Sequence, residues 1–199
     1  IGSHLFDLAQ YVTGWKITEV MADISIAIPR RYKPAGSTQT FANPGSGKGE
    51  PVDVKTEDYC SVLVKFESGA RGVFTVSQIS AGYKNGLALS LDGAKASCSW
   101  EQEKPFELRM GYRDKPNETL LRDPGLLHSS AQPYVHYPGG HEEGWPDSLK
   151  NMMIQFYGAV LNGTAAPDSV ASFEDGLRVM RIIDAVVESA QTGNWVTVK

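Results

Sequence analysis

Residues 60–77 read Cys-Ser-Val-Leu-Val-Lys-Phe-Glu-Ser-Gly-Ala-Arg-Gly-Val-Phe-Thr-Val-Ser, and the architecture of the chain can be worked out from this stretch. Apolar and other residues alternate on both sides of Ser68-Gly69, a pair typical of a tight turn. Two alternating runs joined by such a turn predict an antiparallel β-hairpin. One face of its first strand would carry Cys60, Val62, Val64 and Phe66.

Further strands are expected on both sides of this hairpin. Upstream, residues 17–28 alternate apolar and polar side chains, which predicts one long half-buried strand. Downstream, Asp92-Gly93 is a strong signal for a type I′ turn between two more alternating runs. The strands expected in this downstream part are 87–91, 96–100, 106–112 and 119–121.

Helical periodicity appears at the two ends of the chain. The first helix is expected to begin near Ser3 and to end at Gly14, because glycine tolerates the left-handed conformation of a C-cap. Two more helices are expected from Pro146 or Asp147 to Asn162, and from Ser172 to Gly193. The apolar stripes expected to be buried are Leu5, Leu8, Ala9 and Val12; Leu149, Met152, Met153, Phe156 and Val160; and Leu177, Met180, Ile183 and Val187.

The order of these elements predicts an α+β fold. We expect two layers, with helices on one face of a large, mostly antiparallel, open-faced sheet, and a final short strand at 195–198. Segments 29–51 and 122–146 are expected to be long loops. Sizeable apolar residues fall on both faces of the sheet, as at Val73 and Phe74, so we expect a homo-oligomer through the open face, or a further domain, to cover it.

Composition narrows the class of protein. The 199 residues are 41% apolar and 21% charged, with a formal charge of −4 and no basic stripe, so nothing favours nucleic acid or an anionic membrane. No apolar run is long enough to cross a membrane, and we expect a cytoplasmic protein. Cys60 and Cys98 do not have the spacing of metal ligands, and the four histidines lack a converging carboxylate cluster, so no metal site is expected. A disulfide between the two cysteines is possible, but the sequence does not require one.

His4 and Asp7 form a titratable pair one helical turn apart near the start of the first helix. Imidazole has the side-chain pKa closest to neutrality, so a histidine held beside a carboxylate is a reasonable proton acceptor or donor. The alternative is that His4 merely packs on its neighbours in the first turn. The pair alone does not choose between these two readings.

Taken in order, several short motifs of this chain resemble the C-terminal domain of the Gfo/Idh/MocA oxidoreductase family. The motifs are Gly2-Ser3-His4-Leu5-Phe6-Asp7-Leu8-Ala9, Thr56-Glu57-Asp58-Tyr59, Phe66-Glu67-Ser68-Gly69-Ala70-Arg71-Gly72, Ser77-Gln78, Gly82-Tyr83-Lys84-Asn85-Gly86 and Gly140-His141-Glu142-Glu143-Gly144. The resemblance implies that residues 1–199 are a single substrate-binding and oligomerisation domain. It also implies that the N-terminal Rossmann domain, which binds NAD or NADP in this family, is absent from this chain.

The resemblance also implies a catalytic set: a lysine of the nucleotide domain, and an aspartate and a histidine spaced i, i+4 at the start of a helix. His4 matches the histidine, and its aspartate partner would fall one position before Ile1. Asp7 is then expected to be a structural carboxylate near the helix start. We therefore expect the sequence to be a fragment that has no dehydrogenase activity alone.

Three other residues are candidates for substrate binding. Lys84 and Asn85 offer donors suited to sugar hydroxyls, or else form a plain turn. His141 either donates to a substrate hydroxyl or caps the following helix. Arg30 and Arg31 are expected to be solvent-exposed, and His128 and His136 receive no role. The glycines of 45–49 have no strand-then-helix context, so no cofactor-binding residue is expected in this chain.

The resulting expectation is the substrate-binding half of an NAD(P)-dependent oxidoreductase. It would transfer a hydride between a sugar or polyol hydroxyl and the nicotinamide. One alternative is an NAD-dependent glycosidase of the same family. Another is a non-catalytic dimerisation or ligand-binding module.

Overall fold

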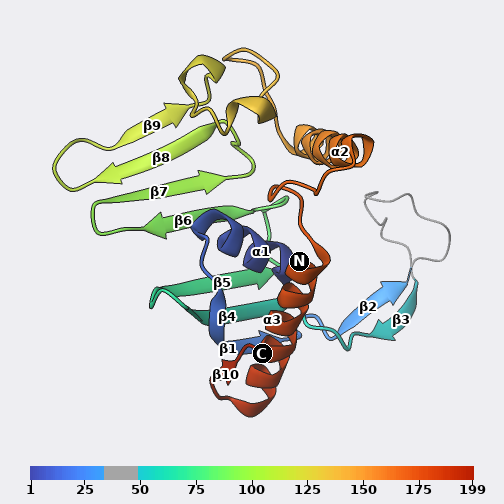
Figure 1. Cartoon of the computed structure of the whole chain (residues 1–199). Helices are drawn as coiled ribbons and strands as arrows, with labels where there is room; N and C mark the ends of the chain where they lie inside the picture. Colours follow the sequence, from blue (N-terminus) through green and yellow to red (C-terminus); the bar gives the residue numbers. More distant parts are fainter. Residues whose placement is uncertain (34–48) are drawn as a thin grey trace. The chain divides into compact units, whose positions relative to one another are not determined.

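The structure is a computed structural model that describes residues 1–33 and 49–199 (Figure 1). The described part of the chain consists of two units. The first unit consists of Ile1–Ala81 and Phe173–Lys199, and the second is Gly82–Ser172. Each unit is built on its own antiparallel sheet.

The predicted hairpin lies within the sheet of the first unit and is confirmed. Its strands pair antiparallel, with Val62 opposite Phe74 and Val64 opposite Gly72. Val62, Val64 and Phe66 are buried on one face, as the alternation predicted. The strand order is β10 (Val196–Thr197), β1 (Ile17–Ser25), β4 (Tyr59–Phe66) and β5 (Arg71–Ser77).

Helices α1 (Gly2–Thr13) and α3 (Phe173–Thr192) contribute to a common apolar core with this sheet. Phe6 of α1 stacks edge-on against Phe74 of β5, with ring centroids 5.2 Å apart. Gly14 ends α1 in the left-handed conformation, at φ 70°, as predicted. The buried residues of this core are Phe6, Ile17, Val20, Val62, Val64, Phe66, Ile182, Ala185 and Val186.

The predicted buried stripes of these two helices are partly wrong. On α3, Leu177, Met180 and Val187 are exposed, whereas Val179, Ile182, Ala185, Val186 and Ser189 are buried. Two apolar stripes overlap on this helix, and the one with the small residues Ala185 and Ser189 lies against β1, where a short side chain allows close packing. On α1, Phe6 and Ala9 are buried and Val12 is 48% exposed, because the sheet lies on the Phe6 side.

The expected strand at 17–28 ends early, and the expected loop at 29–51 is partly wrong. β1 stops at Ser25, and the Asp58 carboxylate accepts hydrogen bonds from the N–H groups of Ala27 and Ile28, at 2.7 and 3.0 Å. A side chain thus takes the place of a neighbouring strand. Beyond this point β2 (Arg30–Lys33) pairs with β3 (Glu50–Asp53) in a two-stranded antiparallel sheet. The glycine-rich segment considered for phosphate binding lies, except for Gly49, outside the described residues.

The second unit contains β6 (Ala88–Asp92), β7 (Ala96–Glu101), β8 (Glu107–Tyr112) and β9 (Glu118–Leu121), paired in this order. Residues 93–95 join the first two of these strands, so the predicted chain reversal is confirmed. The predicted type I′ turn is wrong, because Asp92 still pairs with Ser97 in the strand and Gly93 is not among the glycines with positive φ. The segment after β9 contains two short 3-10 turns, Pro124–Leu126 and Gln132–Tyr134. Helix α2 (Trp145–Asn162) follows.

The apolar stripe predicted to be buried on α2 is exposed instead. The exposed fractions run from 41% for Leu149 to 61% for Val160, and Ala159 is the buried residue of this helix. Its sequence pattern is that of a packed helix, but within the described part of the chain that face is open. The α+β class is confirmed, with the described strands divided among sheets of four, two and four strands.

Candidate active site

His4 lies on the first turn of α1 and is exposed. The helix is held by Phe6 and Ala9, each 3% exposed, so the backbone that carries the imidazole is fixed by the core. Within residues 1–33 and 49–199 the His4 ring makes no hydrogen bond or ion pair, and the same is true of the exposed Asp7 carboxylate. The His4 imidazole is therefore exposed on a helix that the core holds in place, and the Asp7 carboxylate does not pair with this imidazole.

Lys84 and Asn85 lie in the exposed segment before β6. One carboxylate oxygen of Glu103 accepts hydrogen bonds from the N–H groups of Asn85 and Gly86, at 2.9 and 3.2 Å. These hydrogen bonds, the one from Asn85 first, lower the pKa of the Glu103 carboxyl. The turn is therefore fixed through its backbone, which leaves the Lys84 and Asn85 side chains exposed as donors.

His141 lies at the end of a tight turn. Its N–H donates to the carbonyl of Pro138, at 3.3 Å, and Gly140 between them has φ 79°, a conformation that favours glycine. Nδ1 of His141 is 3.4 Å from the carbonyl oxygen of Gly139. The His141 side chain is otherwise exposed, and α2 begins four residues later with Asp147, rather than His141, accepting from the N-cap Gly144 N–H at 3.0 Å.

Sequence reasoning missed the ion pair between Arg122 and Glu143. Arg122 Nη1 lies 2.5 Å from Glu143 Oε2, and the two side chains are 13% and 8% exposed. Glu143 lies in the Gly140–Gly144 motif, but no spacing rule connects it to an arginine twenty-one residues earlier in a segment of irregular structure. This pair lies directly beneath the His141 turn, because Arg122 also donates to the His141 carbonyl.

The remaining histidines have local partners. Nε2 of His136 lies 2.6 Å from Oδ1 of Asn151 on α2, and Nδ1 of His128 lies 2.9 Å from the Ser130 hydroxyl. The Gly144 N–H and Lys150 lower the pKa of Asp147, which lies in the first turn of α2. In the described residues, no three His, Cys, Asp or Glu side chains come together as metal ligands.

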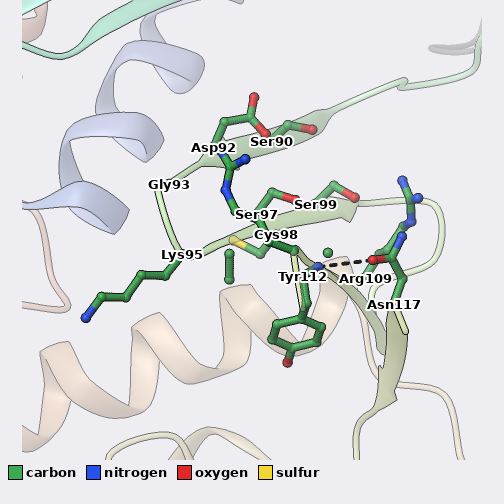
Figure 2. Close-up of a pocket in the computed structure, with 13 residues that line it drawn as sticks. Ser90, Asp92, Gly93, Lys95, Ser97, Cys98, Ser99, Arg109, Tyr112 and Asn117 are labelled. Atoms are coloured by element: carbon green, nitrogen blue, oxygen red, sulfur yellow. Dashed lines mark hydrogen bonds between the residues drawn. The ribbon is translucent and has the colours of Figure 1, made fainter. Parts of the chain in front are cut away.

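A polar recess of about 400 Å³ lies on the sheet of the second unit (Figure 2). Serines of β6 and β7 and Arg109 of β8 line it, and Asn117 accepts a hydrogen bond from the Tyr112 N–H at 3.0 Å. Lys84, Asn85 and His141 do not line this recess, although they belong to the same unit. His4 belongs to the first unit.

The described residues do not form a dinucleotide-binding unit. Such a unit needs a parallel β-α-β arrangement with a glycine-rich turn at the start of its helix. All strand pairs in the described part of the chain are antiparallel. Both cysteines are free thiols in the described part of the chain, and burial raises the pKa of the Cys60 thiol. None of the described helices is long and apolar enough to cross a membrane.

The fold is thus an antiparallel α+β domain that presents polar and imidazole side chains from turns and a helix start. The model of the "Oxidoreductase family, C-terminal alpha/beta domain" matches residues 1–198. The chain belongs to this family, the Gfo/Idh/MocA oxidoreductases, and corresponds to its C-terminal domain.

Three known proteins illustrate the similarity. Levoglucosan dehydrogenase of Pseudarthrobacter phenanthrenivorans is 26% identical over all of this chain and 50% of its own length. A solved structure of a levoglucosan dehydrogenase in complex with NADH and levoglucosan gives a TM-score of 0.78 at 25% identity, with 100% of this chain and 49% of that chain covered. An oxidoreductase domain protein from Kribbella flavida gives 0.82 at 25% identity, with 100% and 50% covered. An inositol dehydrogenase homologue from Azotobacter vinelandii, complexed with NADH and myo-inositol, gives 0.73 at 25% identity, with 99% and 48% covered. The chain spans half or less of the length of the curated relatives it matches.

Proposed function

We propose that this chain is the substrate-binding domain of an NAD(P)-dependent oxidoreductase that acts on a hydroxyl group of a sugar or polyol. The observation that carries the proposal is the family match over residues 1–198, which includes the helix that presents His4. The similar structures named above include complexes with NADH and levoglucosan or myo-inositol, both polyhydroxylated compounds. This supports the proposed class of substrate.

The proposed task of His4 is to take up the hydroxyl proton of the substrate. Oxidation of an alcohol removes a hydride from carbon and a proton from oxygen, and the nicotinamide accepts the hydride. An exposed imidazole on a helix held by the core can be placed within reach of such a hydroxyl and can relay its proton near neutral pH. Lys84, Asn85 and His141 are proposed to donate hydrogen bonds to other hydroxyl groups of the substrate.

The proposal extends to the chain's surroundings. We propose that residues 1–199 act as one domain of a longer protein in which a Rossmann domain binds NAD or NADP. Copies of the protein would associate through the open face of the first unit's sheet, where Leu63 and Val73 are cross-strand neighbours with 45% and 71% of their surfaces exposed. A cytoplasmic location is part of the same proposal.

The experiment compares His4→Ala with His128→Ala in the full-length protein that carries this chain. Both changes remove an exposed imidazole, but His128 contacts only its own loop. Formation of reduced nicotinamide is followed over a panel that includes levoglucosan and myo-inositol. Loss of a general base lowers kcat by about 10²–10⁴-fold, so we expect this loss for His4→Ala and near wild-type rates for His128→Ala.

Two results would overturn parts of this proposal. Unchanged turnover of His4→Ala would remove the catalytic assignment of His4. Release of free aglycone from an aryl glycoside, without net formation of reduced nicotinamide, would favour the glycosidase alternative. Residues 1–199 alone serve as a blank and are expected to form no reduced nicotinamide.

A further inference from the structure

We infer that the buried pair Arg122–Glu143 is a positioning device that fixes the turn presenting His141. The inference rests on the proposed function, in which the His141 side chain donates a hydrogen bond to the substrate. It concerns residues 134–144, which connect the second 3-10 turn with α2. We call this stretch the His141 segment.

Arg122 is itself firmly held. It follows β9 directly, and its backbone N–H donates to the carbonyl of Phe106 beside β8, at 2.8 Å. The guanidinium therefore extends from the end of a sheet strand, and the rigid strand pair β8–β9 fixes its origin.

The guanidinium of Arg122 binds several groups of the His141 segment at once. Nη1 donates to the carbonyl of Tyr137 at 2.9 Å and to Glu143 Oε2 at 2.5 Å. Nη2 donates to the carbonyls of His141 and, at 3.5 Å, Pro138. The planar fork of an arginine suits such a set of acceptors, whereas a lysine offers one point charge.

Glu143 completes the arrangement from the other side. Its Oε2 accepts from Arg122, and its Oε1 accepts from the backbone N–H of His136 at 2.7 Å. The carboxylate thus ties the start of the His141 segment to its end. A buried ion pair is stabilising only when further hydrogen bonds satisfy both ions, and here backbone groups do so, although Arg122 Nε has no partner within the described residues.

The consequence for His141 is a fixed backbone with an exposed side chain. Its N–H is held by Pro138 and its carbonyl by Arg122, while its imidazole is open to solvent. A surface loop that only connected two elements would not need a buried charge to hold three of its carbonyls. Such preorganisation reduces the entropy lost when a side chain binds a substrate.

The test uses Arg122→Lys, His141→Ala and their combination in the full-length protein, with Arg181→Lys as the control. Arg181 is an exposed arginine of α3, and its guanidinium makes no hydrogen bond or ion pair within the described residues. Glu143→Gln is a second variant, for the case that Arg122→Lys folds poorly. It removes the charge of the ion pair but keeps the shape of the side chain. The readouts are kcat and KM for the sugar that the wild type turns over, and amide hydrogen exchange of residues 134–144.

We expect Arg122→Lys to raise KM by about tenfold with little change in kcat, and to speed exchange in the His141 segment. In the His141→Ala background the same change is expected to raise KM less than about twofold, since the imidazole it positions is already gone. A merely structural role would give factors that multiply. Multiplying factors, or unchanged exchange in both Arg122→Lys and Glu143→Gln, would overturn the inference.

Failure of the proposed function would look different. A wild-type protein that reduces no nicotinamide with any sugar or polyol would refute the proposed function and the substrate-facing role of His141 with it. Faster exchange of residues 134–144 in Arg122→Lys would still establish that the ion pair fixes the turn, and unchanged exchange would refute that as well.

Discussion

Replacing Ser189 by alanine removes one oxygen atom, and we expect it to lower the free energy of unfolding of the first unit by more than the loss of a surface hydroxyl would. Ser189 lies on α3 and is 0% exposed. Its hydroxyl accepts a hydrogen bond from the Ala22 N–H of β1 at 2.9 Å and donates to the carbonyl of Asn194 at 2.6 Å. The hydroxyl therefore connects a helix, the sheet and the turn that leads into β10.

The location of Ala22 explains why this hydroxyl matters. On that edge of β1, strand β10 pairs only with Glu19 and Val20, so it ends before Ala22. Ala22 is half-buried, but its N–H donates into the fully buried position of Ser189. Without the Ser189 hydroxyl this N–H has no acceptor within the described residues, and an unsatisfied donor shielded from water costs about 1–3 kcal/mol. Asn194 is exposed, so water can replace its lost donor at little cost. We expect a loss of about 2 kcal/mol, which lowers Tm by about 4–8 °C for a chain of this size.

The matched control is Thr192→Ala. It also removes a hydroxyl from α3, but the Thr192 hydroxyl donates only to carbonyls of its own helix, and the residue is exposed. Its loss is expected to change the free energy of unfolding by less than about 0.5 kcal/mol. The assay is thermal unfolding of both variants, with hydrogen exchange at the Ala22 amide. Equal Tm values for the two variants, or an Ala22 amide that stays as protected as in the wild type, would refute the reasoning.

Two further predictions concern the same unit. Asp58 is 4% exposed, and the N–H groups of Ala27 and Ile28 hold the pKa of its carboxyl below the usual 3.8. The ionised carboxylate therefore contributes its full stabilisation above about pH 3.8, and this stabilisation is lost as the pH falls through the lower pKa of the folded state. Asp58→Asn should therefore be less stable at neutral pH and lose less on acidification, as measured by urea unfolding at several pH values; parallel pH profiles would contradict this. Gly72→Ala should destabilise by about 1–3 kcal/mol, although alanine usually suits a strand better than glycine, because its Cβ would lie 2.9 Å from Val64 Cγ2. A Gly72→Ala protein as stable as the wild type in the same urea assay would count against this packing argument.

Local sequence signals were sufficient for most of the helices and strands of this fold, with β2 and β3 as exceptions. The hairpin at 60–77 and the chain reversal after Asp92 need only alternation and a turn residue to be recognised, and both strand pairings are confirmed, although the turn after Asp92 is not of the predicted type I′. The helix ends near Gly14 and Gly163 follow from glycine in the left-handed conformation. These features depend on neighbours in the chain, so the sequence displays them directly.

Features that depend on distant partners were not predictable in this way. The β2–β3 pairing was missed because Pro29 and Pro51 are typical of loops, although a proline is tolerated in an edge strand. Helix α3 has two candidate apolar stripes, and only its contact with β1 shows which one is buried. A serine in the last turn of a helix, as Ser189 is in α3, is typical of an exposed position, and only its contact with Ala22 shows why it is buried.

The candidate site follows the same division. His4, Lys84, Asn85 and His141 were found from the sequence because motifs carry them, and each of them is exposed. The groups that fix two of their supports, Glu103 under the Lys84–Asn85 turn and the Arg122–Glu143 pair under His141, are joined to them through backbone hydrogen bonds that no motif encodes. Substitutions should therefore separate by type. Removing an exposed imidazole should change activity with little effect on folding, whereas removing a backbone anchor should change loop order first and substrate affinity as a consequence.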